Sequence, residues 1–443
     1  MERRDTERSC KEQAELKKVV DQLYEIPKFT EKHSLEHTKL FLQYLKDPQD
    51  AFQIIHVAGS NGKGSVCMFI SQVLLEAGRS VGLFTSPHLV DIRERFVING
   101  ELCGISDFLE AYVQVQKAAD HFQKNKLGHP TFFEFIFAMG MLLFQKAGVE
   151  YVVLETGLGG RLDATNCVEH PVLTVLTSIS LEHTEILGDT LEQIAFEKAG
   201  ILKPGVPVVF DANCKEAVPV IRKQAELLGC RAVGIDARMC KIHEIKNKFI
   251  DFSICTEYDK GTRWQIPSVC AYQAGNGALA VTALRLLPKS WKLSDETIRQ
   301  GLKKAVWPGR MEEVLPEIYL DGAHNTAGIR EFLRTVKELC KEDAHKPMLL
   351  FSIVKEKDFH QVIRMLTKEQ EWEQVVVSTM PNLRGIPAEK LQELFFEDAG
   401  VSVCAMADYQ EAFRLLQREK KAGQKLFCTG SLYFTGALKQ MLL

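Results

Sequence analysis

The sequence lacks the features that would place a protein in a membrane or outside the cell. Its 443 residues contain no uninterrupted apolar run of about 18 residues, the length that a membrane-spanning helix needs. The first residues are polar and charged, so no secretory signal is expected. The longest apolar segment, 132–144, is too short to span a bilayer and contains Glu134, which predicts a buried helix.

An excess of charge of one sign is also lacking. The chain has 55 Lys and Arg against 58 Asp and Glu, giving a net charge of -3. Bulk charge therefore predicts neither a nucleic-acid partner nor a membrane partner.

Paired cysteines are lacking as well. None of the 12 cysteines belongs to a Cys-x-x-Cys pair, and no closely spaced histidines follow them. The pattern fits neither a zinc site nor a disulfide scaffold. Scattered thiols are typical of a reducing compartment, so we expect a cytoplasmic protein.

What the sequence does contain is an alternation of short apolar runs with helical patterns. This alternation predicts an α/β fold with a mostly parallel sheet. The first series of expected strands comprises 53–59, 80–86, 150–156, 171–179 and 206–211. A second series begins after about residue 308 and comprises 317–325, 348–354, 374–380 and 425–431. Two domains are therefore expected, with a hinge in the segment at about 305–317, which contains prolines and a glycine.

The segment HVAGSNGKGSV lies between an expected strand and an expected helix. Its glycines allow backbone N–H groups to point at phosphate oxygens, and Lys63 can reach the outer phosphates. The strict pattern G-x-x-x-x-G-K-[ST] fails twice, because Val57 replaces the first glycine and Gly64 follows Lys63. An ordinary glycine turn is the alternative, but the strand–loop–helix context favours a phosphate loop.

Polar side chains follow several other expected strands, at the edge where open α/β sheets bind ligands. Ser86 lies in TSPHL, Glu155 precedes TGLGG, and His183 lies in LEHTEILG. Serine and glutamate oxygens suit Mg²⁺. Taken singly, each also has a simpler interpretation, as a turn serine, a surface carboxylate or a packed histidine. Arg161 and Asp163 could likewise form a structural pair.

Taken together, the motifs resemble the folylpolyglutamate synthase family of the Mur ligase superfamily. HVAGSNGKGS, TSPHL, LETGLGGRLDATN, EKAGILKPG, PGRME, LDGAHN and TGSLYF occur in the order of that family, from about residue 35 to the end. The resemblance implies a P-loop ATPase-type domain over 1–305 that binds ATP and folate. It implies a smaller, Rossmann-like Mur-ligase-type domain over 306–443. The implied activity is ATP-dependent addition of L-glutamate to the tail of a reduced folate through an acyl phosphate.

The resemblance also implies roles for individual residues, with ATP as co-substrate and two Mg²⁺ ions. The implied ATP contacts are Ser60, Asn61, Gly62, Lys63, Gly64, Ser65, Asn276, Arg310, Asp321 and His324. The implied Mg²⁺ ligands are Ser86, Glu155, His183 and a carbamylated Lys198. The residues implied to line the pterin site are Thr131, Phe132, Phe133, Glu134, Leu162, Asp163 and Ala164. The residues implied to take part in catalysis are Lys63, His183, Lys198 and Arg310.

The carbamylation of Lys198 also has a physical argument. Ile194, Ala195 and Ile201 surround it in sequence and would desolvate the amine, lower its pKa and favour reaction with CO₂. The alternative is a lysine that snorkels to solvent or forms a surface pair with a neighbouring glutamate, Glu192 or Glu197.

The sequence departs from the family pattern at four single residues, among them Ser60, where the family has threonine, and Glu356, where it has aspartate. Glu182 precedes His183 where the family has aspartate, and Gly277 follows Asn276 where alanine is common. Three other functions stay open: a bifunctional enzyme that also joins glutamate to dihydropteroate, a ligase for peptidoglycan precursors, and a non-catalytic ATP-binding protein. We expect small-molecule substrates and a monomer.

Overall fold

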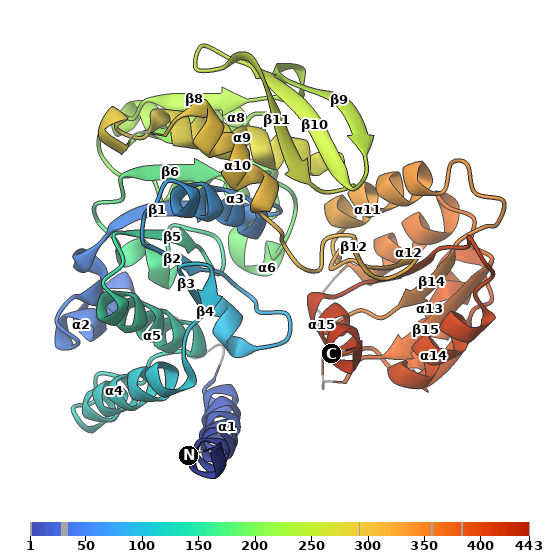
Figure 1. The fold of residues 1–443 in the computed structure, drawn as a ribbon, viewed down its shortest axis with the longest axis horizontal. Coiled ribbons are helices and arrows are strands. Elements are labelled where there is room, and N and C mark those ends of the chain that lie inside the picture. The colour runs from blue at the N-terminus through green and yellow to red at the C-terminus, as the bar shows by residue number, and fades with distance from the viewer. Residues whose placement is uncertain (1, 28–33, 292, 356–357, 382–383, 443) are drawn as a thin grey trace.

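The computed structural model describes residues 2–27, 34–291, 293–355, 358–381 and 384–442. They form two lobes that lie side by side (Figure 1). An eight-stranded sheet with the order β4-β3-β2-β5-β1-β6-β7-β8 runs through the first lobe. Neighbouring strands are parallel except at the β3 and β4 edge. The strands are β1 (Gln53–Ala58), β2 (Val81–Phe84), β3 (Phe96–Ile98), β4 (Glu101–Leu102), β5 (Tyr151–Glu155), β6 (Leu173–Leu176), β7 (Val208–Asp211) and β8 (Ala232–Ile235).

Helices cover both faces of this sheet, as buried parallel strands require. One face packs against α3 (Lys63–Glu76), α9 (Tyr272–Leu286) and α10 (Asp295–Lys304). The other face carries α1 (Glu2–Glu25), α2 (Leu35–Tyr44), α4 (Ile105–Lys124), α5 (Phe132–Ala147), α7 (Leu191–Ala199) and α8 (Ala217–Leu227). Helix α5 is the buried helix predicted at 132–144, and Thr131 and Glu134 form a capping box at its start.

Residues 240–267 form a separate three-stranded antiparallel sheet, which the sequence analysis did not predict. Alternate residues of its central strand are buried, the pattern of a sheet with one covered face. That face packs on the same core as α9 and α10. The strands are β9 (Cys240–Lys246), β10 (Phe249–Cys255) and β11 (Lys260–Pro267).

A six-stranded sheet with the order β12-β13-β17-β14-β15-β16 forms the second lobe. Its strands are β12 (Glu312–Leu315), β13 (Ile318–Leu320), β14 (Met348–Phe351), β15 (Gln374–Thr379), β16 (Cys404–Asp408) and β17 (Leu426–Thr429). One face packs against α11 (Thr326–Leu339), α12 (Phe359–Lys368) and α13 (Ala388–Ala399). The other packs against α14 (Tyr409–Glu419) and α15 (Leu432–Leu442).

The predicted α/β class with a mostly parallel sheet is confirmed, and the expected strands of both series are present. Strand β12 lies within the predicted hinge segment 305–317 and pairs with β13. Residues 305–311 alone connect α10 to the second sheet. Within the described residues, no helix is long and apolar enough to cross a membrane.

Candidate active site between the two lobes

The glycine-rich loop lies at the carboxyl end of the central strand β1 and leads directly into α3. Gly59 and Gly62 have φ angles of 146° and 89°, which residues with a side chain rarely adopt. The Lys63 ammonium donates to the backbone carbonyls of Gly59 at 3.0 Å and Ser60 at 3.1 Å. The Ser60 hydroxyl accepts from the backbone N–H of Ser180 at 3.0 Å, which fixes the loop against the end of β6. The loop is thus preformed, with a cation held over it.

Helix α9 contacts both this loop and the first turn of α3. Gln273 donates to the Ser65 hydroxyl at 3.0 Å, and Asn276 donates to Gln273 at 2.8 Å. A Cβ on Gly62 would lie 2.4 Å from Asn276 Oδ1, so the loop and α9 touch. Asn276 was predicted from the sequence and Gln273 was not, although it lies only three residues earlier.

Glu155 ends β5, next to β1 in the sheet, and is 4% exposed. Its carboxylate accepts from the backbone N–H of Ser86, at the end of the neighbouring strand β2, at 3.1 Å. Burial raises the pKa of Glu155 to about 7, although the positive charges of Lys63 and Arg310 act against this rise. The residue is therefore a buried carboxylate close to cations, and the surface alternative is excluded.

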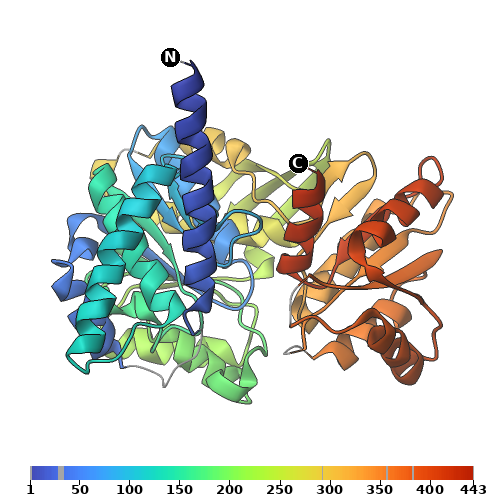
Figure 2. The same ribbon diagram turned by 90° about the horizontal axis from the view of Figure 1, so that it is seen from below.

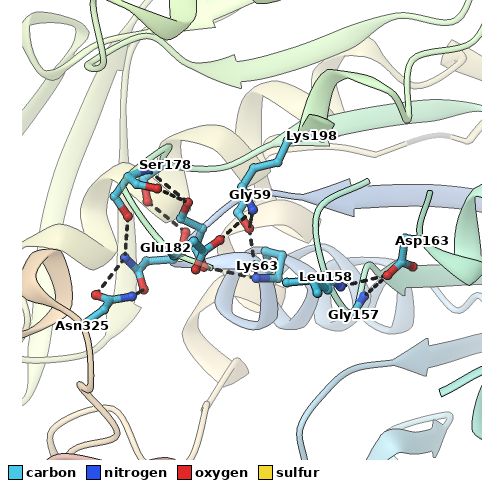
Figure 3. A network of polar contacts seen from close by, with 12 residues as sticks. Gly59, Lys63, Gly157, Leu158, Asp163, Ser178, Glu182, Lys198 and Asn325 are labelled. Atoms are coloured by element: carbon cyan, nitrogen blue, oxygen red, sulfur yellow. Dashed lines mark hydrogen bonds and ion pairs between the residues drawn. The ribbon is translucent and has the colours of Figure 1, made fainter. Parts of the chain in front are cut away.

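Lys198 and Glu182 form a buried ion pair behind the loop, with Nζ and Oε1 2.7 Å apart (Figure 3). Lys198 is 1% exposed and also donates to the Gly59 carbonyl at 2.8 Å. Burial lowers the pKa of Lys198, as expected from its apolar neighbours, while Glu182 opposes the shift. Burial would raise the pKa of Glu182, but the charges of Lys198 and Lys63 outweigh it and bring the value to about 2.

The surface alternatives for this region are wrong. Lys198 pairs with neither nearby glutamate of α7, and Glu197 instead pairs with Arg161 at 2.8 Å. The alternative pair of Arg161 with Asp163 does not form. The Asp163 carboxylate accepts from the backbone N–H groups of Gly157 at 3.0 Å and Leu158 at 2.8 Å, so it holds the TGLGG turn together (Figure 3).

The predicted pterin residues lie around that turn. The Phe133 ring lies against Gly157, since a Cβ there would be 2.5 Å from it. Leu162 is 39% exposed and available to a ligand, whereas Ala164 is buried. Phe132 is also buried, and the Thr131 hydroxyl accepts from the Glu134 backbone. The Glu134 carboxylate accepts from Thr38 at 2.8 Å and from the Thr131 N–H at 2.7 Å. The carboxylates of Glu134 and Asp163 are thus both engaged with backbone N–H groups.

A cavity of about 530 Å³ lies between the lobes, next to the glycine loop. Predicted ATP contacts from both lobes line it: Asn61, Gly62, Ser65, Asn276, Arg310, Asp321 and His324. Its apolar lining includes Ile179, Ile235, Ile242 and Leu279, which were not predicted from the sequence because they come from four separate segments of the chain. A lining that combines polar groups with apolar side chains suits a nucleotide.

Side chains of the second lobe close the cavity. The Asp321 carboxylate accepts from the backbone N–H groups of Met311 and Ala323, each at 2.8 Å. Burial raises the pKa of Asp321, and Arg310 acts against this rise. Asn325 donates to Asn61 of the glycine loop at 3.2 Å, so the lobes touch directly over the loop (Figure 3).

Arg95 is a further buried cation, near the contact between the two lobes. It was not predicted from the sequence. It is 5% exposed, and its Nε donates to His88 Nδ1 at 2.8 Å. Among the described residues, no carboxylate forms an ion pair with it. Glu155 and the Tyr433 hydroxyl lie near enough to affect its pKa, which burial lowers. The signal in the sequence was the ERF motif, in which Arg95 is the central residue.

Known proteins share this arrangement. The family model described as the Mur ligase middle domain matches residues 57–284, and that of the Mur ligase, glutamate ligase domain matches 309–432. A dihydrofolate synthase/folylpolyglutamate synthase of Bacillus subtilis is 34% identical over 94% of this chain and 96% of its own length. The chain belongs to the folylpolyglutamate synthase family of Mur ligases.

Solved structures of the family superpose on this Mur ligase along almost its whole length. The crystal structure of folylpolyglutamate synthase from Thermotoga maritima is 30% identical, with a TM-score of 0.82 and 97% of each chain covered. A folylpolyglutamate synthase complex with AMPPCP and folate is 28% identical, with a TM-score of 0.81, covering 97% of this chain and 99% of the other. As a member of this family, the protein is an ATP-dependent ligase that forms C–N bonds.

The donor groups of this Mur ligase suit Mg²⁺ in part. Glu155 offers a buried carboxylate next to the hydroxyl-bearing Ser86, and hard oxygens are what Mg²⁺ prefers. Lys198 as an ammonium is no ligand. His183 is exposed at the start of the short helix α6 (Thr184–Leu187). Within the described residues, no three His, Cys, Asp or Glu side chains are grouped to hold a metal ion.

Proposed function

We propose that this Mur ligase adds L-glutamate to the glutamate tail of a reduced folate in the cytoplasm. ATP is converted to ADP and phosphate. The observation that carries the proposal is the meeting of three features at one seam: the preformed phosphate loop, the buried Glu155 and the buried Arg95. The likeness to a complex with AMPPCP and folate supports the choice of substrates.

The reaction needs an activated acyl group, because a carboxylate has no good leaving group. Transfer of the ATP γ-phosphoryl group to the folate tail carboxylate gives an acyl phosphate and ADP. The glutamate amine then attacks the acyl carbon, the C–O bond to phosphate breaks, and the amine loses a proton as the amide forms. Phosphoryl transfer depends mainly on positioning and on neutralising charge spread over the phosphate oxygens.

Lys63 is suited to neutralising that charge. Its ammonium is held by two carbonyls of its own loop and can exchange them for phosphate oxygens when ATP binds. Arg310 lies on the connection between the lobes and lines the cavity. Asp321 holds the backbone next to Arg310 in place. We assign the remaining loop residues, from Ser60 to Ser65, to the phosphates, and Asn276 and His324 to the rest of the nucleotide.

Mg²⁺, when bound, would neutralise the transferring phosphoryl group. Ser86 and Glu155 would hold one ion, and His183 and a carbamylated Lys198 would hold the second. Carbamylation replaces the ammonium beside Glu182 by an anion. Two anions with so little solvent exposure would repel one another, so the modified lysine requires a cation close by.

Arg95 would receive a carboxylate of the incoming glutamate. A buried guanidinium without an acidic partner is costly unless a ligand supplies one, and carboxylates fit its forked donors. The pterin would lie against Phe133 and Leu162, while Glu134 and Asp163 keep the walls rigid.

Glutamate incorporation with tetrahydrofolate and with dihydropteroate, offered separately, tests the function. We expect ATP-dependent incorporation into tetrahydrofolate, with one phosphate released for each amide formed. Incorporation into dihydropteroate as well would establish the bifunctional alternative. Turnover of ATP without incorporation into either acceptor would contradict the proposal.

A further inference from the structure

Helix α1 ends beside the seam between the lobes. Leu16, Val19 and Leu23 bury its apolar face against the first lobe. Figure 2 shows α1 lying along that lobe, with its amino-terminal end projecting beyond the body. Its last turn carries Tyr24, whose side chain stays 46% exposed and stacks on Phe132 with ring centroids 5.9 Å apart. Packing accounts for the apolar face of α1 but not for the hydroxyl of Tyr24.

Two hydrogen bonds connect that hydroxyl to Arg95. Arg95 Nε lies 2.8 Å from His88 Nδ1, and His88 Nε2 lies 2.9 Å from the Tyr24 hydroxyl. A guanidinium can only donate, so His88 Nδ1 is an acceptor and the ring hydrogen is on Nε2. His88 therefore donates to Tyr24. The direction of both bonds is set by Arg95.

Within the described residues, the donors at the two ends of the relay have no other hydrogen-bond partner. Tyr24 accepts from His88, so its own O–H hydrogen is available to another acceptor. Burial raises the pKa of Tyr24, which therefore keeps that hydrogen at neutral pH. At the other end, with Nε engaged, the two terminal nitrogens of Arg95 are the pair that can bind a carboxylate end-on. The Phe132 ring lies 5.6 Å from the Arg95 guanidinium carbon and helps to fix its plane.

We propose that Tyr24 is a positioning residue of the ligase, which acts through His88 to fix the Arg95 guanidinium for a carboxylate of the incoming amino acid. The inference rests on the proposed function, which supplies that carboxylate. It makes α1 part of the amino-acid site. The first turn of α15 borders the same place, since Tyr433 is near enough to affect both Tyr24 and Arg95 electrostatically.

Tyr24→Phe tests the relay, because it removes the hydroxyl and keeps the ring that stacks on Phe132. The KM for L-glutamate should rise about three- to tenfold, the effect of one lost hydrogen bond. The KM for ATP and the kcat at saturating glutamate should stay within about twofold of the wild type. A loss confined to kcat, or an equal rise of both KM values, would overturn the inference.

Tyr112→Phe is the matched control. Tyr112 of α4 donates to Gln22 of α1 at 3.1 Å, so this variant also removes a hydroxyl that tethers α1, but not one connected to Arg95. Its KM values should be those of the wild type. The same rise in this control would show that the docking of α1 matters rather than the relay, and would overturn the inference.

A double variant separates a relay from a direct contact. In a His88→Phe background the relay is already broken, so adding Tyr24→Phe should change the KM for glutamate no further. A further rise would show that Tyr24 binds the ligand directly and would overturn the positioning role. An unchanged KM in an active Tyr24→Phe enzyme would overturn the inference alone. A wild-type enzyme unable to incorporate glutamate would overturn the proposed function and this inference with it.

Discussion

Lys198 and Glu182 form an ion pair beneath the phosphate loop, with Nζ 2.7 Å from Oε1, and the same ammonium donates to the Gly59 carbonyl. The pair thereby connects α7, the segment before α6 and the first residue of the loop. Lys198 is almost fully buried, and Glu182 is its charge partner. The Lys198 amine, which we propose to be carbamylated, therefore also helps to hold the loop in its conformation.

Lys198→Ala should abolish ligase activity. Without Mg²⁺, where Lys198 is the ammonium that pairs with Glu182, the variant should also lower the free energy of unfolding by about 3–5 kcal/mol, because it removes the charge partner of Glu182. Acetate should restore part of the activity by replacing the missing carboxylate. Activity is measured as phosphate release and stability by urea unfolding. A Lys198→Met, Glu182→Gln double variant is the control for charge and should regain stability without activity. Full activity of Lys198→Ala would contradict the proposed role.

Lys63→Ala should abolish ATP turnover and leave the fold intact. Within the described part of the chain, the ammonium donates only to carbonyls of its own loop, so little core packing is lost. Single-turnover assays would measure the chemical step, and the melting temperature would report on stability. Lys39→Ala, which removes an exposed pair with Glu169, is the matched control. A near-normal kcat in Lys63→Ala would refute the phosphate-loop assignment.

Glu155→Gln should weaken the use of Mg²⁺ more than the binding of folate or glutamate. The amide keeps the size of the side chain and can still accept from Ser86, but it has no negative charge. Because burial already disfavours the charged form of Glu155, the variant should be at least as stable as the wild type. A Mg²⁺ titration of the rate measures the effect. Unchanged activity at every Mg²⁺ concentration would make Glu155 a structural residue.

Arg310→Ala should lower kcat by about 10²-fold, as expected when a group that neutralises phosphoryl charge is lost. The melting temperature should change little, because Arg310 lines the cavity instead of packing in a core. Steady-state kinetics with scanning calorimetry would separate the two effects. A large drop in melting temperature with retained activity would reverse the interpretation.

His56 predicts a pH dependence of stability. It is fully buried on β1 and hydrogen-bonded to Thr165, and burial lowers its pKa to about 3. Since the unfolded chain binds a proton near pH 6.5 and the folded chain does not, stability is full above pH 6.5 and falls as the pH drops towards 3. Between pH 7 and pH 5 the wild type should lose about 2 kcal/mol more than His56→Gln, measured by urea unfolding. Equal losses of stability in the wild type and in His56→Gln would contradict the assignment of this pH dependence to His56.

The sequence by itself determined the elements of both lobes. Continuous apolar runs predicted the buried parallel strands, and GSNGKGS between a strand and a helix predicted the phosphate loop. These features could be predicted because burial of apolar side chains and the turn at a glycine act over a few neighbouring residues. The small sheet over 240–267 was missed, since its exposed first strand carries no continuous apolar signal.

Only the tertiary structure decided how the polar side chains of the site are partnered. Arg161 and Asp163 are close in sequence, yet Arg161 pairs with Glu197 and Asp163 turns inward to the TGLGG backbone. Likewise Lys198 forms an ion pair with Glu182, and Arg95 donates a hydrogen bond to His88. The physical reason is that a buried charge must be partnered by whatever donor or acceptor the packing of distant segments brings to it. Local pattern specifies which side chains are available, and packing of the lobes selects among them.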